Sequence, residues 1–283
     1  MKKLFVLVGL FTVLFTTAQT QDTLYVWKAG VLVNIQSIKT ADMDSITFKR
    51  PVNPNGINIP GPNVTDIDGN VYASVTNCGL TFTKQNLNVT KYSDGTPIPQ
   101  VTDPTQWANL TTGAWCYYNN DQANGAIYGK LYNWYAVAGI YDAASLSNTA
   151  LRKKLAPTGW HVPTDAEWSS LINCLDPNAD GGNVFPNIAG GKMKATGTIQ
   201  AGTGLWQTPN TEASNESGFT GLSGGWRWTG FASIGYYGNW WSSTEFASTD
   251  AWSWIITNNT SSINRGEDFT LKLLGLSVRC VRD

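Results

Sequence analysis

The stretch LAPTGWHVPTDAEWSSLINCL, residues 155–175, carries the strongest structural signal of the chain. Thr164 and Glu167 fit a capping box, in which each side chain accepts a hydrogen bond from a backbone N–H that the helix start leaves free. Four apolar residues follow at spacings of three and four, namely Trp168, Leu171, Ile172 and Leu175. This spacing predicts an amphipathic helix that packs its apolar side against a core.

The same stretch holds the residues that acid–base chemistry would need. Asp165 and Glu167 could form a carboxylate pair, but the helix cap and the helix dipole account for both without chemistry. His161 is the only histidine, which excludes a multi-histidine metal site and leaves a nucleophilic mechanism a single base. We therefore predict a packed, hydrogen-bonded His161 and a protein that is not an enzyme.

Further elements surround this helix. Residues 64–75 predict a hairpin that turns at Asp68-Gly69-Asn70, and Asp103-Pro104 is typical of a helix start. Apolar spacing predicts a second main helix over 126–138, ended by Gly139. Trp252, Trp254 and Ile256 alternate along a predicted strand, and residues 276–281 form another. We expect an α+β domain with two main helices on small antiparallel sheets.

The chain begins with the pattern of a signal peptide, which we assign to residues 1–18. Lys2 and Lys3 precede an apolar run of 12 residues, 4–15, and small residues follow at 16–18. The run is too short for a membrane span, which needs about 20 apolar residues. We expect an exported protein without a span in its mature chain, whether periplasmic, surface-bound or secreted.

Residues 19–50 predict a short β segment. Two strand-like runs, 23–27 and 31–35, flank Ala29-Gly30 as in a hairpin, and 45–48 offers a third strand. Residues 51–63 hold four prolines and two glycines, a composition that predicts a linker. The remainder, 64–283, contains no second linker and forms the main domain.

Composition excludes several classes of function. Only 14% of the residues are charged, against about 25% in typical soluble domains. A net charge of −1 without a basic stripe argues against nucleic acid as a partner, because such binding depends on phosphate neutralisation. Aromatic residues are abundant instead, with 13 Trp, 11 Tyr and 10 Phe.

These aromatic residues provide the candidate binding site. Exposed Trp and Tyr rings can stack on sugar rings, although a loop-rich domain short of aliphatic residues also needs Trp for its core. Trp240 and Trp241 are adjacent and point to opposite sides of a strand, so one of them could face outward. The candidate ligand-binding residues are Trp226, Trp228, Tyr237, Trp240 and Trp241.

A turn after the predicted helix weakly resembles a calcium loop. Residues 176–181 alternate oxygen-bearing side chains before Gly181, as such a loop does. However, Asn187 occupies the position of the bidentate glutamate and Pro177 interrupts the loop. We predict a solvated turn and neither a metal site nor a cofactor, with calcium as the alternative.

Eight ordered blocks resemble the Fibrobacter succinogenes major paralogous domain, a family common in exported proteins of Bacteroidota and Fibrobacteres. The resemblance covers residues 64–283 and brings no established activity. The blocks are NLNVTKYSDGTPIP, AWCYYNND, YGKLYNWYAV, LAPTGWHVPTDAEW, GGKMKATG, NESGFTGLSGG, YGNWWSSTE and SVRCVRD.

A more distant resemblance concerns the fold. HVPTDAEW and the terminal SVRCVRD are similar to blocks of formylglycine-generating enzymes, whose fold is a variant of the C-type lectin fold. This resemblance implies a C-type-lectin-like architecture with long Trp- and Gly-rich loops. The catalytic cysteine pair of those enzymes has no counterpart here, because the only late cysteine is Cys280.

An exported chain with four cysteines predicts two disulfides, for which three pairings exist. The family blocks AWCYYNND and SVRCVRD each contain a cysteine, so the resemblance implies a bond between Cys116 and Cys280, with Cys78 and Cys174 as the other pair. The rival bond, Cys174–Cys280, follows the helix-to-last-strand bridge of lectins.

These observations lead to three hypotheses. The first is an exported binding module that recognises glycan or another surface polymer. The second is a structural or adhesive cell-surface protein that binds other proteins. The third hypothesis is an enzyme related to the formylglycine-generating enzymes. It ranks last because the sequence shows no set of acid, base, nucleophile or metal ligand.

Overall fold

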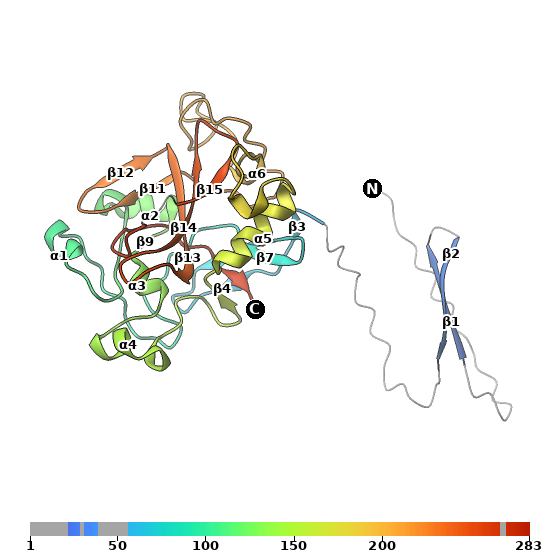
Figure 1. The fold of residues 1–283 in the computed structure, drawn as a ribbon, viewed down its shortest axis with the longest axis horizontal. Coiled ribbons are helices and arrows are strands. Elements are labelled where there is room, and N and C mark those ends of the chain that lie inside the picture. The colour runs from blue at the N-terminus through green and yellow to red at the C-terminus, as the bar shows by residue number, and fades with distance from the viewer. Residues whose placement is uncertain (1–21, 29–30, 39–55, 267–269) are drawn as a thin grey trace. The chain divides into compact units, whose positions relative to one another are not determined.

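The computed structural model describes residues 22–28, 31–38, 56–266 and 270–283, and the chain divides into two compact units, Met1–Pro51 and Val52–Asp283 (Figure 1). In the first unit, β1 (Asp22–Lys28) and β2 (Val31–Ile38) pair antiparallel. These two strands contain both runs from which the sequence predicts a hairpin. The expected signal peptide, 1–18, and the expected third strand, 45–48, lie outside the described residues.

The second unit mixes short helices with small antiparallel sheets, so the expectation of an α+β domain is confirmed. The helices are α1 (Pro104–Ala108), α2 (Gln122–Tyr128), α3 (Trp134–Val137), α4 (Ala143–Ser147), α5 (Asp165–Leu175) and α6 (Ala189–Met193). The expectation of two main helices is therefore wrong for the described residues.

The strands of the second unit are mostly short. They are β3 (Ile59–Pro60), β4 (Val64–Thr65), β5 (Val71–Tyr72), β6 (Ser74–Asn77), β7 (Leu80–Thr83), β8 (Trp115–Cys116), β9 (Leu131–Tyr132), β10 (Trp160–His161), β11 (Gly224–Arg227), β12 (Phe231–Ile234), β13 (Tyr237–Glu245), β14 (Ala251–Thr257), β15 (Ile263–Arg265) and β16 (Val281–Arg282). The hairpin predicted over 64–75 is present as β4 and β5, which pair antiparallel.

Helix α5 forms as its local sequence predicts. Thr164 caps its N-terminus, and the hydrogen bonds between Thr164 and Glu167 complete the capping box. All four residues of the predicted apolar stripe are buried, and they pack in one core cluster: Trp168, Leu171, Ile172 and Leu175. The cap and the buried stripe therefore stabilise the same helix. It is the longest helix among the described residues of the second unit.

The helix predicted over 126–138 is wrong. Gly129 ends α2 with φ +75°, a backbone conformation that favours glycine. Leu131 and Tyr132 instead form β9, which pairs with β8. Asn133 then caps α3 by accepting a hydrogen bond from the backbone N–H of Ala136. The apolar residues of this segment thus belong to three short elements, α2, β9 and α3, which contact different neighbours.

The largest sheet joins the beginning and the end of the domain. Its strand order is β10-β16-β7-β6-β3. The edge strand β3 lies in the segment 51–63, which the sequence predicts to be a linker. The strand residues of that segment, Ile59–Pro60, are therefore part of the folded domain. Pro60 is tolerated there because an edge strand leaves one row of backbone donors unpaired.

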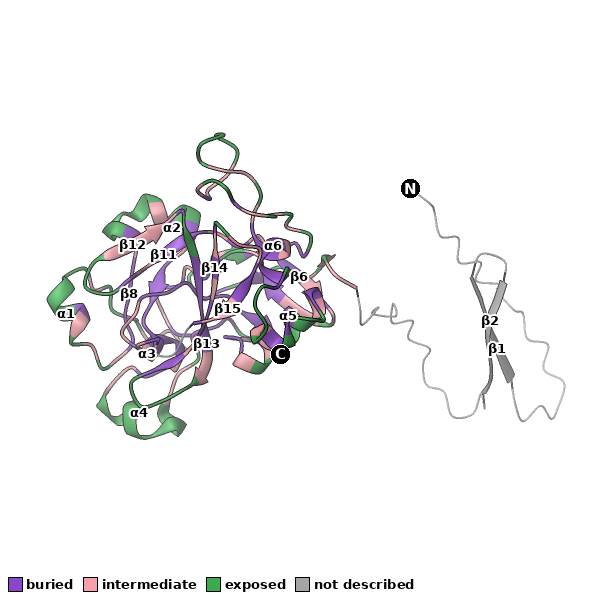
Figure 2. Cartoon of the chain, turned by 45° about the horizontal axis from the view of Figure 1, so that its top comes forward, coloured by how far each residue is buried: buried purple, intermediate pink, exposed green. Residues whose placement is uncertain are grey.

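Strand β13 separates two core clusters, and this accounts for its paired tryptophans. Trp240 packs with Trp168 and Trp254 in one cluster, whereas Trp241 packs with Tyr132 in the other. Successive side chains of a strand point to opposite faces, and at Trp240 and Trp241 both faces are covered. Figure 2 shows β13 and β14 largely buried, while α4 lies exposed at the periphery.

Five buried cations tie the loops together by donating hydrogen bonds to oxygen acceptors, most of them backbone carbonyls. They are Lys130, Lys194, Arg227, Lys272 and Arg279, none more than 3% exposed. Lys194, for example, donates to three carbonyl oxygens, those of Thr211, Thr257 and Thr260. Burial lowers its pKa to about 8. The few charges of the chain therefore contribute to the interior of the domain as well as to its surface.

One of the two expected disulfides is present. Cys78, in the turn between β6 and β7, is bonded to Cys174 of α5. Cys116 and Cys280 are free, buried thiols, so the expected bond between them is wrong. They belong to separate core clusters. Cys280 also points away from α5, whereas the next residue, Val281, packs with the helix, so the rival Cys174–Cys280 bond does not form either.

Candidate functional site

Three of the five candidate aromatic residues meet at one surface cavity of about 320 Å³. They are Trp226, Trp228 and Tyr237. Trp228 and Tyr237 are 48% and 40% exposed, whereas Trp226 is half-buried. These exposures leave ring surface available for a ligand. We call this site the aromatic cavity. Its lining residues are Trp226, Trp228, Tyr237, Asn239, Ser253, Ile255, Thr270, Leu271, Leu274 and Leu276.

The remaining two candidates, Trp240 and Trp241, are not available to a ligand. Both are fully buried, and their indole N–H groups donate to Asn86 Oδ1 and to the backbone oxygen of Tyr132. The expectation that one of them faces outward is wrong, because a core cluster covers each face of β13 at these two residues. Trp240 packs in the core on the opposite face of β13, and Trp241 packs in the core further along the face that the cavity uses.

The floor of the cavity is one face of the β13–β14 pair. Tyr237 and Asn239 lie two residues apart on β13 and therefore share a face. Asn239 lies opposite Ile255 in the register of the two strands. Ser253 lies on the same face of β14, and its hydroxyl is hydrogen-bonded to that of Thr270 at 2.8 Å. Regular strands thus hold these side chains in fixed positions.

A second apolar surface comes from the segment 270–276, which the sequence reasoning missed. Leu271, Leu274 and Leu276 line the cavity together with the floor and the aromatic residues. Two pairings with distant strands fix this segment: Gly275 pairs with Arg227 of β11, and Leu276 pairs with Tyr132 of β9. The leucines of TLKLLGL, residues 270–276, indicate an apolar segment in the sequence. Only the long-range pairings place these leucines at the cavity.

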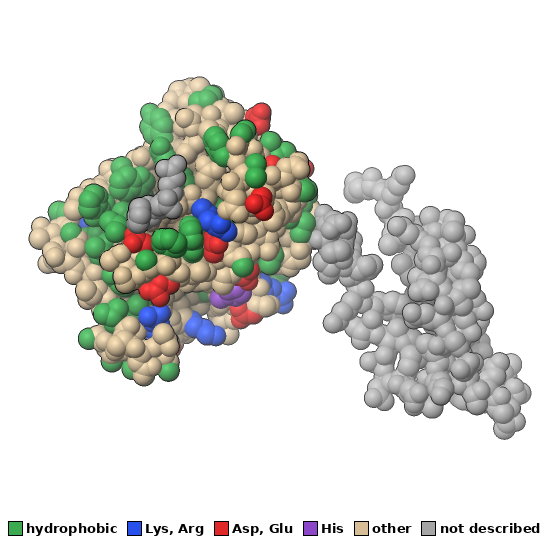
Figure 3. Space-filling view, in the orientation of Figure 1, with side chains coloured by type: hydrophobic (Ala, Val, Ile, Leu, Met, Phe, Trp, Pro, Cys, Tyr) green, Lys and Arg blue, Asp and Glu red, His purple; other side chains and the backbone are tan. Residues whose placement is uncertain are grey.

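The described lining of the aromatic cavity carries no charge. None of its ten described lining residues is acidic or basic. The closest cations in the sequence are already engaged, since Lys272 pairs with Glu245 and Arg227 donates to the carbonyl oxygens of Val101 and Thr102. Figure 3 shows hydrophobic side chains gathered on the part of the domain where Figure 1 places β11 and β12.

The carboxylates of the capping stretch have separate partners. Asp165 pairs with Arg265 at 2.9 Å. His161 lies between two other carboxylates, with Nδ1 2.7 Å from Asp283 and Nε2 2.8 Å from Glu167. Partial burial alone would lower the pKa of His161, but the two carboxylates raise it above its usual value. Asp165 and Glu167 thus hold elements together.

The turn after α5 uses its first carboxylate for the backbone. The two oxygens of Asp176 accept hydrogen bonds from the backbone N–H groups of Asn178 and Ile188. Asn187 is buried and donates to the carbonyl oxygens of Val184 and Ile263. Both side chains are thereby engaged within the fold, and the expectation of a turn without a metal, with calcium as the alternative, stays a prediction.

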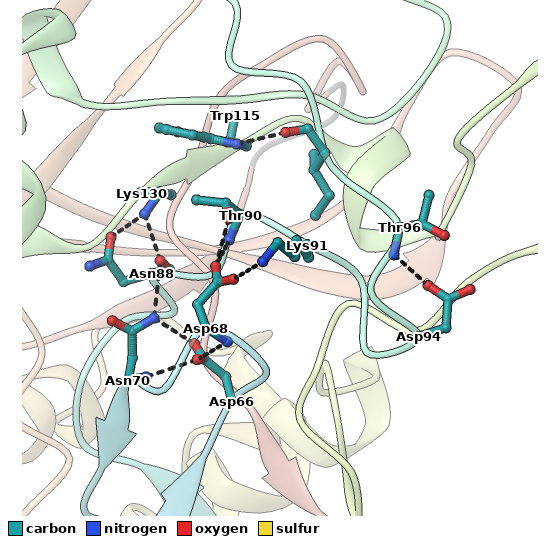
Figure 4. A network of polar contacts seen from close by, with 11 residues as sticks. Asp66, Asp68, Asn70, Asn88, Thr90, Lys91, Asp94, Thr96, Trp115 and Lys130 are labelled. Atoms are coloured by element: carbon teal, nitrogen blue, oxygen red, sulfur yellow. Dashed lines mark hydrogen bonds and ion pairs between the residues drawn. The ribbon is translucent and has the colours of Figure 1, made fainter.

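A second cavity, of about 190 Å³, adjoins the β4–β5 turn. Asp66 closes that turn by accepting from the backbone N–H groups of Asp68 and Asn70 and from the Tyr72 hydroxyl. Figure 4 shows the neighbouring Lys130, which donates to the backbone and side-chain oxygens of Asn88. Because these polar groups satisfy one another, the network stabilises the turn, and the aromatic cavity is the better candidate site.

Lys130 is a cation without a carboxylate partner among the described residues. Its ammonium lies over the rings of Trp115 and Tyr117, at 4.6 and 5.0 Å from their centroids. Burial lowers its pKa to about 8, although Asp68 and Asp66 act in the opposite direction. Aromatic faces and carbonyl oxygens together stabilise this charge.

Fold and site define an α+β domain with an aromatic cavity whose described lining residues are all uncharged. The described residues contain no group of three or more His, Cys, Asp or Glu that could hold a metal ion. They also include no helix of the length and apolarity required for crossing a bilayer.

The family model of the Fibrobacter succinogenes major domain matches residues 75–282, so the chain belongs to this family. The expected membership is confirmed. The chain matches no curated protein and no solved structure. The resemblance to formylglycine-generating enzymes and the C-type-lectin-like fold therefore stay predictions.

Proposed function

We propose that this protein is an exported, non-catalytic binding module that recognises glycan through its aromatic cavity. The observation that carries the proposal is the convergence of Trp226, Trp228 and Tyr237 on one cavity. They come from β11, from the residue that follows it, and from β13. Such rings present flat apolar faces on which the C–H groups of a sugar ring can stack. A ligand pocket of this kind is mostly apolar, with a few polar groups that orient the ligand.

Export and a lectin-like architecture fit this proposal. The signal pattern at 1–18 directs the chain out of the cytoplasm, and the Cys78–Cys174 bond suits an oxidising compartment. The expected C-type-lectin-like fold has termini that lie close together, and here β3 and β16 belong to one sheet. Fold likeness alone proves no ligand, so the proposal depends on the cavity.

The absence of catalysis is part of the proposal. Among the described residues, the candidate carboxylates and the single histidine have structural partners, and no charged group lines the aromatic cavity. A site of this chemistry can bind and orient a ligand but offers neither a general acid nor a general base. We therefore expect binding without turnover.

The test is a polysaccharide and glycan array with the oxidised protein, followed by calorimetry on the hits. We expect Trp228→Ala and Tyr237→Ala each to weaken binding about tenfold, which corresponds to about 1.4 kcal/mol. Tyr236→Ala is the matched control, because Tyr236 is 47% exposed but does not line the cavity. Equal losses in all three variants would contradict the proposed site. Repeating the array with calcium and with chelator tests the Asp176 turn.

A second candidate function is adhesion to another protein. Leu271, Leu274, Leu276 and Ile255 give the cavity an aliphatic surface that could accept apolar side chains of a peptide. A complete lack of glycan binding across the array, with the variants folded, would favour this function over the first.

A further inference from the structure

We infer that the ligand of the aromatic cavity is an uncharged pyranose chain whose ring substituents are all equatorial. The inference rests on the proposed function and specifies the chemical class of the sugar. It starts from the charge of the site, because none of the ten described lining residues is acidic or basic. A charged sugar would lose hydration on entering this cavity and gain no ionic partner in return.

The cations around the cavity cannot supply that partner. Arg227 is fully buried and donates to carbonyl oxygens. Lys272 is 3% exposed and is engaged by Glu245 and by the backbone oxygen of Ser248. Arg265 pairs with Asp165. Within the described part of the chain, a uronate, sulfate or phosphate group on the ligand would therefore have to break an existing contact to pair with Arg227, Lys272 or Arg265.

The second step concerns the faces of the ring. The cavity has two apolar surfaces from different elements: the aromatic residues of the β11 and β13 region, and the leucines of the segment 270–276. A pyranose ring with only equatorial hydroxyls exposes C–H groups on both faces. An axial hydroxyl makes one face polar, and burying that hydroxyl without a hydrogen bond is unfavourable. Two apolar surfaces consequently favour the all-equatorial ring.

The third step concerns the polar groups and the size. Asn239, Ser253 and Thr270 are the polar non-aromatic residues of the lining, and the two hydroxyls are already bonded to each other. Asn239 is 5% exposed and its amide N–H donates to the carbonyl oxygen of Gly225 at 3.4 Å, so its Oδ1 is the main candidate to accept a hydrogen bond from a ring hydroxyl. A volume of about 320 Å³ lies near the lower limit for ligand pockets. The site thus suits a short stretch or an end of a chain.

The experiment compares oligosaccharides of equal length by calorimetry, using the full-length oxidised protein. The probes are cello-oligosaccharides, β-1,4-linked manno-oligosaccharides, which carry one axial hydroxyl at C2 of each ring, and β-1,4-linked oligomers of glucuronate. We expect cello-oligosaccharides to bind at least about tenfold more tightly than the axial series and glucuronate not to bind. Raising the salt concentration should leave the affinity unchanged, because no ion pair forms.

The variants link this preference to the cavity. Trp228→Ala should weaken cello-oligosaccharide binding about tenfold or more, and Tyr236→Ala should not. Tighter binding of an axial or an acidic series through Trp228 would overturn the inference while the proposed function stands. If no oligosaccharide or arrayed glycan binds a folded protein, both fail together.

Discussion

His161 illustrates how one residue joins distant parts of this domain. Its ring contacts Glu167, which also completes the cap of α5, and Asp283, which follows β16. Glu167 accepts from the backbone N–H and the hydroxyl of Thr164, and its pKa is held below the usual value despite partial burial. One carboxylate thereby stabilises a helix start and a histidine that contacts the end of a sheet.

The raised pKa of His161 predicts a pH-dependent contribution to stability. In the folded protein the ring binds its proton more tightly than at the ordinary value of 6.5. The contribution is complete below pH 6.5 and is lost as the pH rises through the higher folded pKa. Because 38% of the side chain is exposed, we expect no more than about 1 kcal/mol.

Urea unfolding of the wild type and of His161→Gln, compared at about pH 5.5 and about pH 8.5, checks this expectation. The wild type should be the more stable of the two at the lower pH, and the difference should shrink at the higher pH. A difference that is the same at both values would show that the ring contributes only packing.

At the scale of elements, α5 and the β4–β5 hairpin could be predicted because their signals are local. A capping box, an apolar stripe and a turn sequence act within a few residues. The segment 122–137 could not be predicted in the same way. Its apolar residues fit a helix, but Gly129 and the pairing of β9 with β8 divide it, and that pairing depends on residues distant in the sequence.

Gly129→Ala tests that explanation. An added Cβ would lie 2.8 Å from the carbonyl oxygen of Leu87 and 3.0 Å from Asn86, in a backbone with φ +75°. We expect a loss of about 3 kcal/mol or more, since backbone strain and a steric clash act together. Gly159→Ala is the matched control, because Gly159 has φ +78° and no atom within 4 Å of an added Cβ.

Strain alone should cost Gly159→Ala about 1–2 kcal/mol. The difference between the two variants in chemical unfolding then measures the close approach of Gly129 to residues 86–87 together with the strain of its ψ of −160°. Equal losses would show that the contact is relieved by small shifts and that the positive φ alone decides the end of α2.

At the scale of the whole molecule, the candidate site was only partly predictable. Composition and the lectin-like resemblance drew attention to the late aromatic residues, and Trp226, Trp228 and Tyr237 do meet at a cavity. The sequence could not separate them from Trp240 and Trp241, because burial depends on which clusters cover each face of β13. The leucines of the segment 270–276 were missed for the same reason, since long-range pairings position them.

The cysteines give the last prediction, because their pairing is a property of the whole fold. The Cys78–Cys174 bond joins residues 96 positions apart and connects the β6–β7 turn to α5. A closed loop of this length restricts the unfolded chain strongly, so replacing both residues by serine should cost about 2–5 kcal/mol. Cys116 and Cys280 are buried, and burial raises the pKa of both thiols, that of Cys116 to about 11.

These thiols should therefore resist modification in the folded protein. Titration with a thiol reagent in denaturant, without reductant, should find two thiols per chain, and peptide mapping should place them at Cys116 and Cys280. Cys116→Ala is the control for stability, because it removes a thiol without opening a covalent loop. A titre of zero would mean that the second pair is bonded after all, which would require the separate core clusters around Cys116 and Cys280 to rearrange.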